Sequence, residues 1–272
     1  MDEGLAVSLL EAIAIGLLSS VVIAAAGYRA RALTLDGAVA AVAVGTAVFG
    51  FGGPRWAVVM IGFFVLSSGL SRAGKRRKRS VERFVEKGSR RDAVQVLANG
   101  GVAALLAVVH QIGGVGYSFP AYLGAMAAAT ADTWSTEIGA LSVSPPRSIL
   151  TGKSVEPGSS GGVTLLGLLA ALGGGLAIGL IGGVASRNAP QLILVGLVAG
   201  LGGSVADSLL GASIQRTYRC PNCLTLTERA VHDCGTTTVP LRGWAVVNND
   251  TVNGLTTIFG ALCGAAFYLL LA

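Results

Sequence analysis

The feature of this sequence that most constrains its fold is a series of eight apolar stretches. A helix needs about 20 apolar residues to cross a bilayer's hydrocarbon core. Only 12% of the 272 residues are charged, against about 25% in soluble domains, which excludes an ordinary soluble enzyme, a disordered chain or a disulfide scaffold. We predict one all-α domain over residues 1–272, a polytopic bundle with spans near Leu5–Ala26, Gly37–Gly52, Trp56–Ser71, Val94–Ile112, Tyr117–Leu141, Val163–Val184, Gln191–Ala212 and Asn253–Ala272.

Two features refine these spans. The first stretch follows Asp2 and Glu3, whereas a cleaved signal peptide begins with positive charge, so we expect a retained span. The turn Gly52-Gly53-Pro54 predicts a tight hairpin between the second and third spans.

The basic residues predict the orientation. Eight spans place loops 28–36, 72–93, 142–162 and 213–252 on one side, and these hold 18 of the 20 Lys and Arg residues. Basic loops stay in the cytoplasm. We therefore expect a cell (plasma) membrane protein with both termini outside and the functional loops inside. The net charge is +6, but the sequence has no accompanying motif that would indicate nucleic-acid binding.

The fifth span ends in polar residues that are costly in hydrocarbon. Asp132 and Glu137 lie there among three hydroxyl residues, and such groups face a cavity or partners. On an ideal helix the two carboxylates point about 140° apart. Binding of one ion by both would require the helix to end or unwind between them. The alternative is a helix end capped by its own side chains.

The seventh span carries a similar segment. Asp207 follows small residues, as Asp132 does, which suggests an internal repeat with two acidic helices facing each other. Chance similarity in so Gly- and Ala-rich a chain is the alternative.

Loop 142–162 resembles a phosphate-binding loop only in part. A P-loop needs glycine five residues before Gly152, where Arg147 stands, so that motif fails. Glycines and serines leading into a helix N-terminus still offer backbone N–H groups to an anion. We expect a phosphate cradle, the alternative being a flexible linker; its members are Arg147, Lys153, Gly158, Ser159, Ser160, Gly161 and Gly162.

Two further polar groups lie at span ends. Arg91, Gln95 and Asn99 recur at i, i+4 steps on an otherwise apolar helix, and so form one stripe. Asp250 lies among three asparagines where the last span begins. Helix capping is the alternative interpretation of this second group, although three Asn and one Asp in six residues exceed what one cap uses.

The last loop contains a metal-ligand pattern. Cys220 and Cys223 are followed by His232 and Cys234, while Cys263 is alone in the last span. A cytosolic loop disfavours disulfides, and three Cys with one His can ligate Zn²⁺. Free thiols in a turn are the alternative.

The motifs together resemble the phytyl-phosphate kinase family, which includes a plant chloroplast enzyme and animal transmembrane-protein-19-like proteins. The resemblance rests on the pattern from Ala128 to Gly139, on Pro146-Arg147 and on Pro157 to Gly162. Supporting matches cover nearly the whole chain: Leu66-Ser67-Ser68, Arg91 through Gln95 to Asn99-Gly100-Gly101, Asp207 to Ala212 with Gln215, Asn249-Asp250 and Val252-Asn253. One departure is Asp92, where the family pattern has Asn after the arginine.

The resemblance implies a kinase that transfers a phosphoryl group from a nucleoside triphosphate, CTP above all, to an isoprenoid monophosphate. Asp132, Glu137, Asp207 and Asp250 would bind Mg²⁺, with Lys153 also catalytic, and the cradle would bind the nucleotide phosphates. Arg91, Gln95 and Asn99 would bind the lipid phosphate, with the tail between helices among the membrane lipids. A CTP-dependent cytidylyltransferase and a cation-coupled transporter are the alternatives. The sequence leaves open tail length, nucleotide and homo-oligomerisation.

Overall fold

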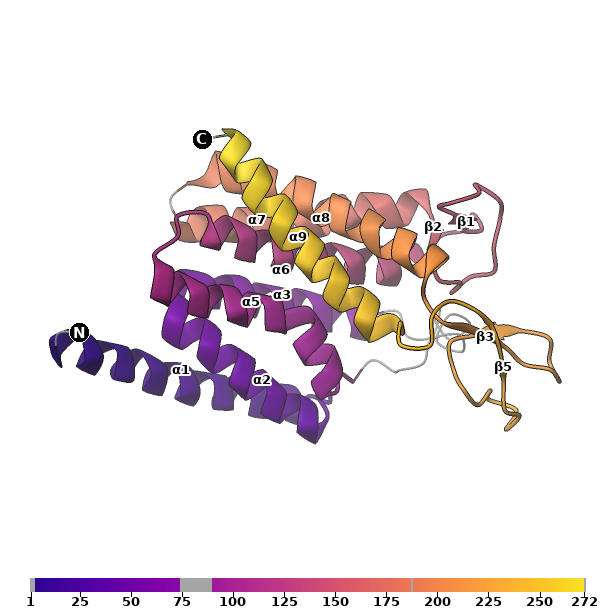
Figure 1. The fold of residues 1–272 in the computed structure, drawn as a ribbon, viewed down its shortest axis with the longest axis horizontal. Coiled ribbons are helices and arrows are strands. Elements are labelled where there is room, and N and C mark those ends of the chain that lie inside the picture. Colours follow the sequence, from indigo (N-terminus) through magenta and orange to yellow (C-terminus); the bar gives the residue numbers. More distant parts are fainter. Residues whose placement is uncertain (1–2, 74–89, 187, 272) are drawn as a thin grey trace.

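The computed structural model describes residues 3–73, 90–186 and 188–271, and side chains from Ser8 onward. Most of the basic loop 72–93 therefore lies outside the described residues. The described chain is an all-α bundle in which eight long helices match the eight expected spans (Figure 1). They are α1 (Glu3–Arg29), α2 (Leu35–Ala47) continued by a π-helical turn η1 (Val48–Gly52), α3 (Pro54–Arg72), α5 (Ala93–Gly113), α6 (Ser118–Gly139), α7 (Leu165–Ser186), α8 (Ala189–Ser213) and α9 (Asn249–Leu271).

Local sequence explains where several helices begin and end. The expected turn after η1 is present: Gly53 has φ +79° and Pro54 starts α3. This agrees with the preference of proline for a first helical turn. Asp92 caps α5 by accepting a hydrogen bond from the Gln95 N–H, and Gly114 ends that helix with φ +60°.

Helix α6 is the centre of the bundle and differs in composition from the others. Seven described helices are long and apolar enough to span a membrane, and α6 is the exception. Helices α3, α5, α7, α8 and α9 pack around it, and every residue from Ser118 to Ala131 is buried. Because its neighbours shield it from lipid, α6 can carry polar residues that an outer helix could not.

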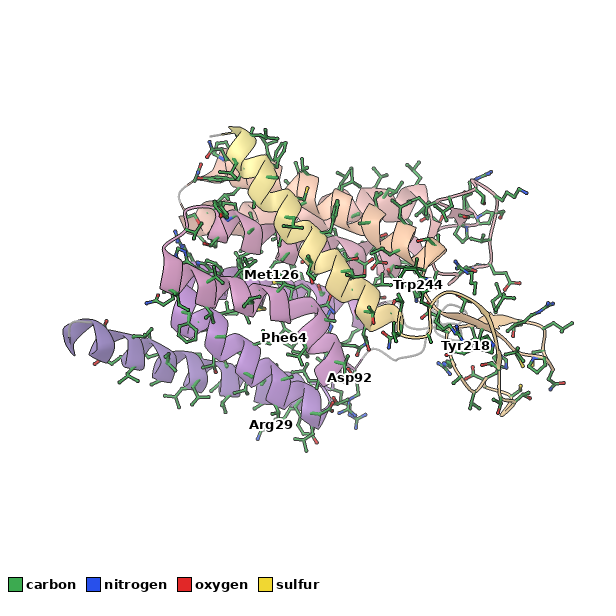
Figure 2. All side chains as sticks on the ribbon, viewed as in Figure 1. Arg29, Phe64, Asp92, Met126, Tyr218 and Trp244 are labelled. Carbon is green, nitrogen blue, oxygen red and sulfur yellow. The ribbon has the colours of Figure 1, made fainter. Side chains whose placement is uncertain are left out.

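Small residues and aromatic rings hold this centre together. A methyl group on Gly124 would collide with the Gly260 carbonyl of α9, so these helices approach at backbone distance. The Tyr122 ring packs at a tilt of 40° against Trp56 of α3 with ring centroids 4.4 Å apart, and its hydroxyl donates to the Trp56 carbonyl at 2.7 Å. Met126 lies in the middle of the bundle (Figure 2).

The loops form two small sheets at one end of the bundle, and both termini lie at the other end (Figure 1). Strands β1 (Arg147–Ser148) and β2 (Gly162–Val163) pair antiparallel within the 142–162 loop. Strands β3 (Thr217–Arg219), β4 (Leu226–Thr227) and β5 (Val239–Arg242) form an antiparallel sheet in the order β4-β3-β5. Tyr218 marks this second sheet in Figure 2.

Candidate functional site

A polar cavity of about 420 Å³ lies where the loops meet the helix ends. The ends of α6 and α8, the first residue of α9 and two loops form its walls. The polar residues that line it include Asp132, Thr136, Ser159, Ser160, Asp207, Ser208, Gln215, Glu228 and Asn249. It therefore gathers expected residues from the fifth span, the seventh span and the cradle into one site.

Asp132 and Asp207 meet in this cavity. Their carboxyl groups lie close enough to interact electrostatically, and Thr256 of α9 donates to Asp207 Oδ1 at 3.2 Å. The approach depends on small residues one turn earlier, because a methyl on Gly203 would collide with Ala128. Two neighbouring carboxylates repel each other when both are charged, and a shared proton or a bound cation would relieve that repulsion.

The segment Gly158–Gly162 forms the opposite part of the wall. Gly161 has φ +78° and packs against Ala212 of α8, where a methyl group would not fit. The Ser159 hydroxyl is buried and has no hydrogen-bond partner among the described residues. The N–H groups of Ser159 and Gly162 are bonded within the loop, to the Glu156 and Ser159 carbonyls. The loop thus offers an unused hydroxyl, but fewer free N–H groups than expected.

Sequence reasoning missed Glu228. This residue directly follows β4, and its Oε1 accepts hydrogen bonds from Ser160 at 2.6 Å and from Gln215 at 2.8 Å. Arg242 donates to the Ser160 carbonyl at 3.4 Å and also to the Ala212 carbonyl. The sequence signal was weak: Gln215 belongs to the family pattern, but nothing marks an acidic residue thirteen positions later.

Glu137 and Asp250 do not join the aspartate pair. Helix α6 continues without unwinding to Gly139, so Glu137 points elsewhere, and its charge acts on Arg91. Asp250 is 5% exposed in the first turn of α9 and does not line the cavity, although the neighbouring Asn249 does. Of the four carboxylates expected to bind Mg²⁺, the described structure therefore brings Asp132 and Asp207 together in the cavity, while Glu137 and Asp250 lie outside its lining.

Arg147 and Lys153 are exposed and do not line the cavity. Arg147 instead donates to the Gly152 carbonyl at 2.9 Å, across the turn between β1 and β2. Both cationic side chains therefore belong to the cradle loop but not to the part of it that lines the cavity.

Arg91, Gln95 and Asn99 border a different, almost entirely apolar pocket of about 70 Å³. Its other walls are side chains of α1, α2, α3 and α5, among them Ile23, Val44, Met60 and Phe64. The three polar residues therefore line the same apolar cleft between helices.

The polar stripe is partly engaged by its own helix. The Gln95 Oε1 accepts from the Asp92 N–H at 3.2 Å, and Asn99 donates to the Gln95 carbonyl at 2.9 Å. The departure at Asp92 therefore has a structural role, as the helix cap. The Arg91 guanidinium lies over the Phe63 ring at 5.2 Å. Burial lowers the pKa of Arg91 to about 10, while Glu137 favours its charged form, so it stays cationic near neutral pH.

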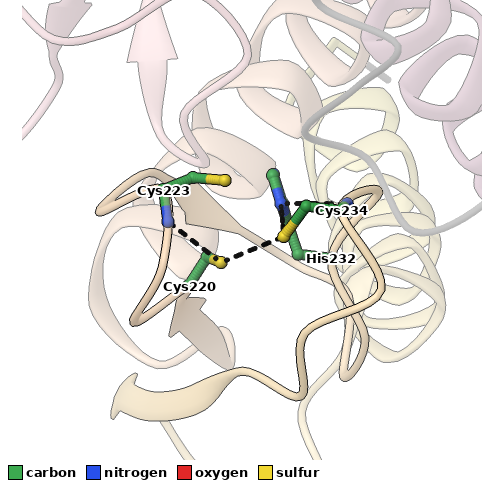
Figure 3. Close-up of side chains that lie close together, drawn as sticks. All are labelled: Cys220, Cys223, His232 and Cys234. Atoms are coloured by element: carbon green, nitrogen blue, oxygen red, sulfur yellow. Dashed lines mark hydrogen bonds between the residues drawn. The ribbon is translucent and has the colours of Figure 1, made fainter.

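Outside the cavity, Cys220, Cys223, His232 and Cys234 gather in the last loop (Figure 3). One potential ligand atom from each lies within 4.8 Å of the others. The thiols are free. A hydrogen bond with Thr236, followed by one with His232, lowers the pKa of Cys234 to about 5.

Comparison with known proteins finds relatives that are similar in sequence to this chain. The chain is 36% identical over 182 residues to Protein PGR of Arabidopsis thaliana, covering 59% of this chain and 60% of that protein. It is 34% identical over 154 residues to the uncharacterized membrane protein MJ0933 of Methanocaldococcus jannaschii, covering 57% and 63%. The matches thus span less than two thirds of either relative. No solved structure matches the chain significantly.

The family comparison covers more of the chain. The family described as integral membrane protein DUF92 matches residues 17–261, which include every helix from α2 to α8, both loop sheets and the paired aspartates. The chain therefore belongs to the DUF92 family of integral membrane proteins.

Proposed function

We propose that this protein is a magnesium-dependent membrane phosphotransferase. It would move the terminal phosphoryl group of a nucleoside triphosphate, with CTP as the expected donor, onto an isoprenoid monophosphate of the phytyl or geranylgeranyl type. The observation that carries the proposal is the polar cavity, which the Asp132–Asp207 pair shares with a glycine- and serine-rich loop.

The polar cavity suits the nucleotide. Protein sites for Mg²⁺ with a nucleotide usually supply one or two carboxylates and leave the remaining positions to phosphates and water. Asp132 and Asp207 fit that role, because their close approach needs a positive charge between them once both are ionised. The bound ion would neutralise charge that develops on the phosphate oxygens.

The cradle would contact the phosphates directly. The buried Ser159 hydroxyl has a hydrogen bond left to donate. Arg147 and Lys153 lie on the outer side of the same loop, where they would attract an anionic nucleotide rather than touch the reacting atoms. Glu228 would act through Ser160 and Gln215, which it holds in the wall.

The apolar pocket suits the lipid acceptor. A prenyl tail would lie between α1, α2, α3 and α5, with its phosphate near Arg91. Glu137 connects the two sites: its charge acts on Arg91, while the adjacent Thr136 lines the polar cavity. The acceptor and donor sites therefore flank the same end of α6.

The reaction then needs positioning more than acid–base chemistry. An oxygen of the lipid phosphate would attack the terminal phosphorus, the bond to the bridging oxygen would break, and the nucleoside diphosphate would leave with those electrons. No strong base is required, since a phosphate monoester is largely ionised near neutral pH.

Transfer of labelled phosphate tests this function. Purified protein is incubated with geranylgeranyl phosphate, Mg²⁺ and nucleoside triphosphates labelled in either the terminal or the innermost phosphate. We expect the terminal label alone to appear in a lipid diphosphate. Transfer of the innermost label with pyrophosphate release would show a cytidylyltransferase instead, and transfer of neither label would contradict an enzyme of this class.

A further inference from the structure

The cluster of Cys220, Cys223, His232 and Cys234 has no part in the proposed phosphoryl transfer. We propose that these four residues bind one Zn²⁺ ion, and that the ion holds the loop sheet that places Glu228 in the wall of the polar cavity. The proposal rests on the ligand distances, the surrounding hydrogen bonds and the composition of the loop, and its metal-binding part does not depend on the proposed function.

The distances fit a tetrahedral site. Zinc bonds of about 2.3 Å to sulfur and about 2.0–2.1 Å to nitrogen place neighbouring ligand atoms about 3.5–3.8 Å apart. Cys220 Sγ and Cys234 Sγ are 3.6 Å apart, and His232 Nδ1 is 3.2 Å from Cys234 Sγ. Cys223 Sγ completes the set, within 4.8 Å of the other three ligand atoms. Small side-chain adjustments would bring all four around one ion.

The hydrogen bonds around the cluster match those of a metal site. A ligating histidine usually donates its second ring N–H to a nearby acceptor, which fixes its orientation. Here His232 Nδ1 faces the sulfur, and Nε2 lies 3.3 Å from Thr225 Oγ1. The Cys223 N–H donates to Cys220 Sγ at 3.4 Å. The ligands are therefore already oriented by neighbouring residues.

The same geometry disfavours a disulfide. A disulfide needs sulfur atoms about 2.05 Å apart, whereas Cys220 and Cys234 are at van der Waals separation and all the thiols are free. The set also includes a histidine and a third sulfur, with all four ligand atoms within 4.8 Å of one another, which a simple pair of redox cysteines does not require.

The loop needs such a constraint because it lacks an apolar core. Its strands have two to four residues each. The buried side chains between Gln215 and Val247 are mostly polar, namely Gln215, Thr217, Cys220, Thr227, Thr238 and Val247. Small units of this kind are commonly stabilised by a structural metal.

The position of the ligands explains what the ion would hold. Cys220 follows β3, and Cys223 precedes β4, so the metal closes the turn of that hairpin. Glu228 comes directly after β4 and accepts from Ser160 and Gln215. Fixing the hairpin therefore fixes one wall of the polar cavity.

Metal content tests the binding directly. Protein purified without chelators is assayed by elemental analysis beside Cys223→Ser, Cys234→Ser and the matched control Cys263→Ser, whose cysteine lies alone in α9. We expect about one zinc per chain in wild type and control and a loss of at least tenfold in the two ligand variants. The zinc site would be overturned if wild type contained no zinc and also showed no Co²⁺ absorption on reconstitution. It would also be overturned if wild type contained about one iron per chain instead of zinc. Equal zinc in all variants would overturn it as well.

Limited proteolysis tests the structural role. Trypsin sites lie at Arg219, the last residue of β3, and at Arg229, two residues after β4. Cleavage there is expected to become at least tenfold faster in Cys223→Ser and in chelated wild type, with no change in Cys263→Ser or in helix content. Metal loss without faster cleavage would overturn the role of the ion in holding the loop. Neither readout uses phosphotransfer, so a failed kinase assay would leave this result intact.

Discussion

At the scale of single residues, Ser159 offers a buried hydroxyl without a hydrogen-bond partner among the described residues, in a loop that lines the polar cavity. A buried hydroxyl without a partner costs about 1–3 kcal/mol. Ser159 lies in the cavity wall beside Ser160, whose hydroxyl is already bonded to Glu228. A ligand that accepts the Ser159 hydrogen bond would recover that cost.

Replacement of Ser159 by alanine is therefore expected to affect nucleotide use but not stability. A hydrogen bond to a charged group contributes about 1.5–3 kcal/mol, which corresponds to a rise of roughly 10- to 100-fold in the nucleotide KM. The melting temperature in detergent should stay the same or rise. Ser154→Ala is the matched control, because Ser154 is an exposed serine in the same loop. Equal kinetics for the two variants would remove Ser159 from the site.

Arg91 and Lys153 should separate the two substrates kinetically. Arg91→Ala is expected to raise the KM for the lipid phosphate about 10- to 100-fold, since a charged hydrogen bond is lost, with partial rescue by Arg91→Lys. Lys153→Ala should raise only the nucleotide KM, by several-fold and less at high salt, because an exposed cation acts through a screened field. A rise in nucleotide KM for Arg91→Ala with unchanged lipid KM would contradict the assignment of the apolar pocket to the acceptor.

Which polar residues belong near the site could be predicted from the sequence far better than where their side chains point. Intramembrane carboxylates are costly, so Asp132 and Asp207 stood out, and helix geometry already separated Asp132 from Glu137. The sequence could not show that Glu137 acts on Arg91, because that depends on how α5 packs against α6. Arg147 points away from the cavity owing to the β1–β2 turn, which no local pattern encodes.

At the scale of helices, backbone contact between α6 and α9 brings Asp207's partner Thr256 into place. Gly124 of α6 lies against Gly260 and Gly264 of α9, and Gly203 of α8 lies against Ala128 of α6. The small residues thus set the distance between the helices that carry the paired aspartates.

Gly124→Ala is expected to push α6 and α9 apart. Overpacking of a tight contact typically costs about 1–3 kcal/mol, so the melting temperature in detergent should fall by several degrees and phosphotransfer should weaken. The control is Gly101→Ala in α5, where an added methyl meets no atom within 4 Å. That change should be neutral or stabilise by about 0.5–1 kcal/mol, as for other helix interiors. Equal melting of both variants would show that the α6–α9 contact can relax.

Helices were predictable to within a few residues, whereas the loop sheets were not. Span Val94–Ile112 became α5 (Ala93–Gly113), because apolar length and capping residues are local signals. Strands of two to four residues leave no alternating pattern, so the approach of Glu228 to Ser160 across 68 positions was invisible to pattern analysis.

At the scale of the whole molecule, loops 28–36, 142–162 and 213–252 lie at one end of the bundle, and the ends of the chain lie at the other (Figure 1). These are the described loops whose basic residues were expected on one side of the membrane. The basic loops predict that this end faces the cytoplasm. A cysteine placed at Ser154 should react with an impermeant maleimide only after the membrane is opened, and one at Gln111 should react before. Both positions are exposed. Labelling of Ser154→Cys in sealed right-side-out vesicles above the wild-type level would reverse the orientation.

The paired aspartates are the centre of this account, and their replacement by asparagine tests it most directly. The rate of phosphoryl transfer from CTP to geranylgeranyl phosphate is measured for wild type, Asp132→Asn, Asp207→Asn and the control Asp233→Asn, whose carboxylate pairs with Arg229 outside the cavity. Removing one electrostatic contact to the developing charge typically costs about 10²–10³ in rate. We expect that loss in both cavity variants, at unchanged melting temperature, and a near-normal rate in the control. A folded Asp132→Asn or Asp207→Asn protein with near-normal activity would contradict the assignment of the metal and the reaction to this cavity.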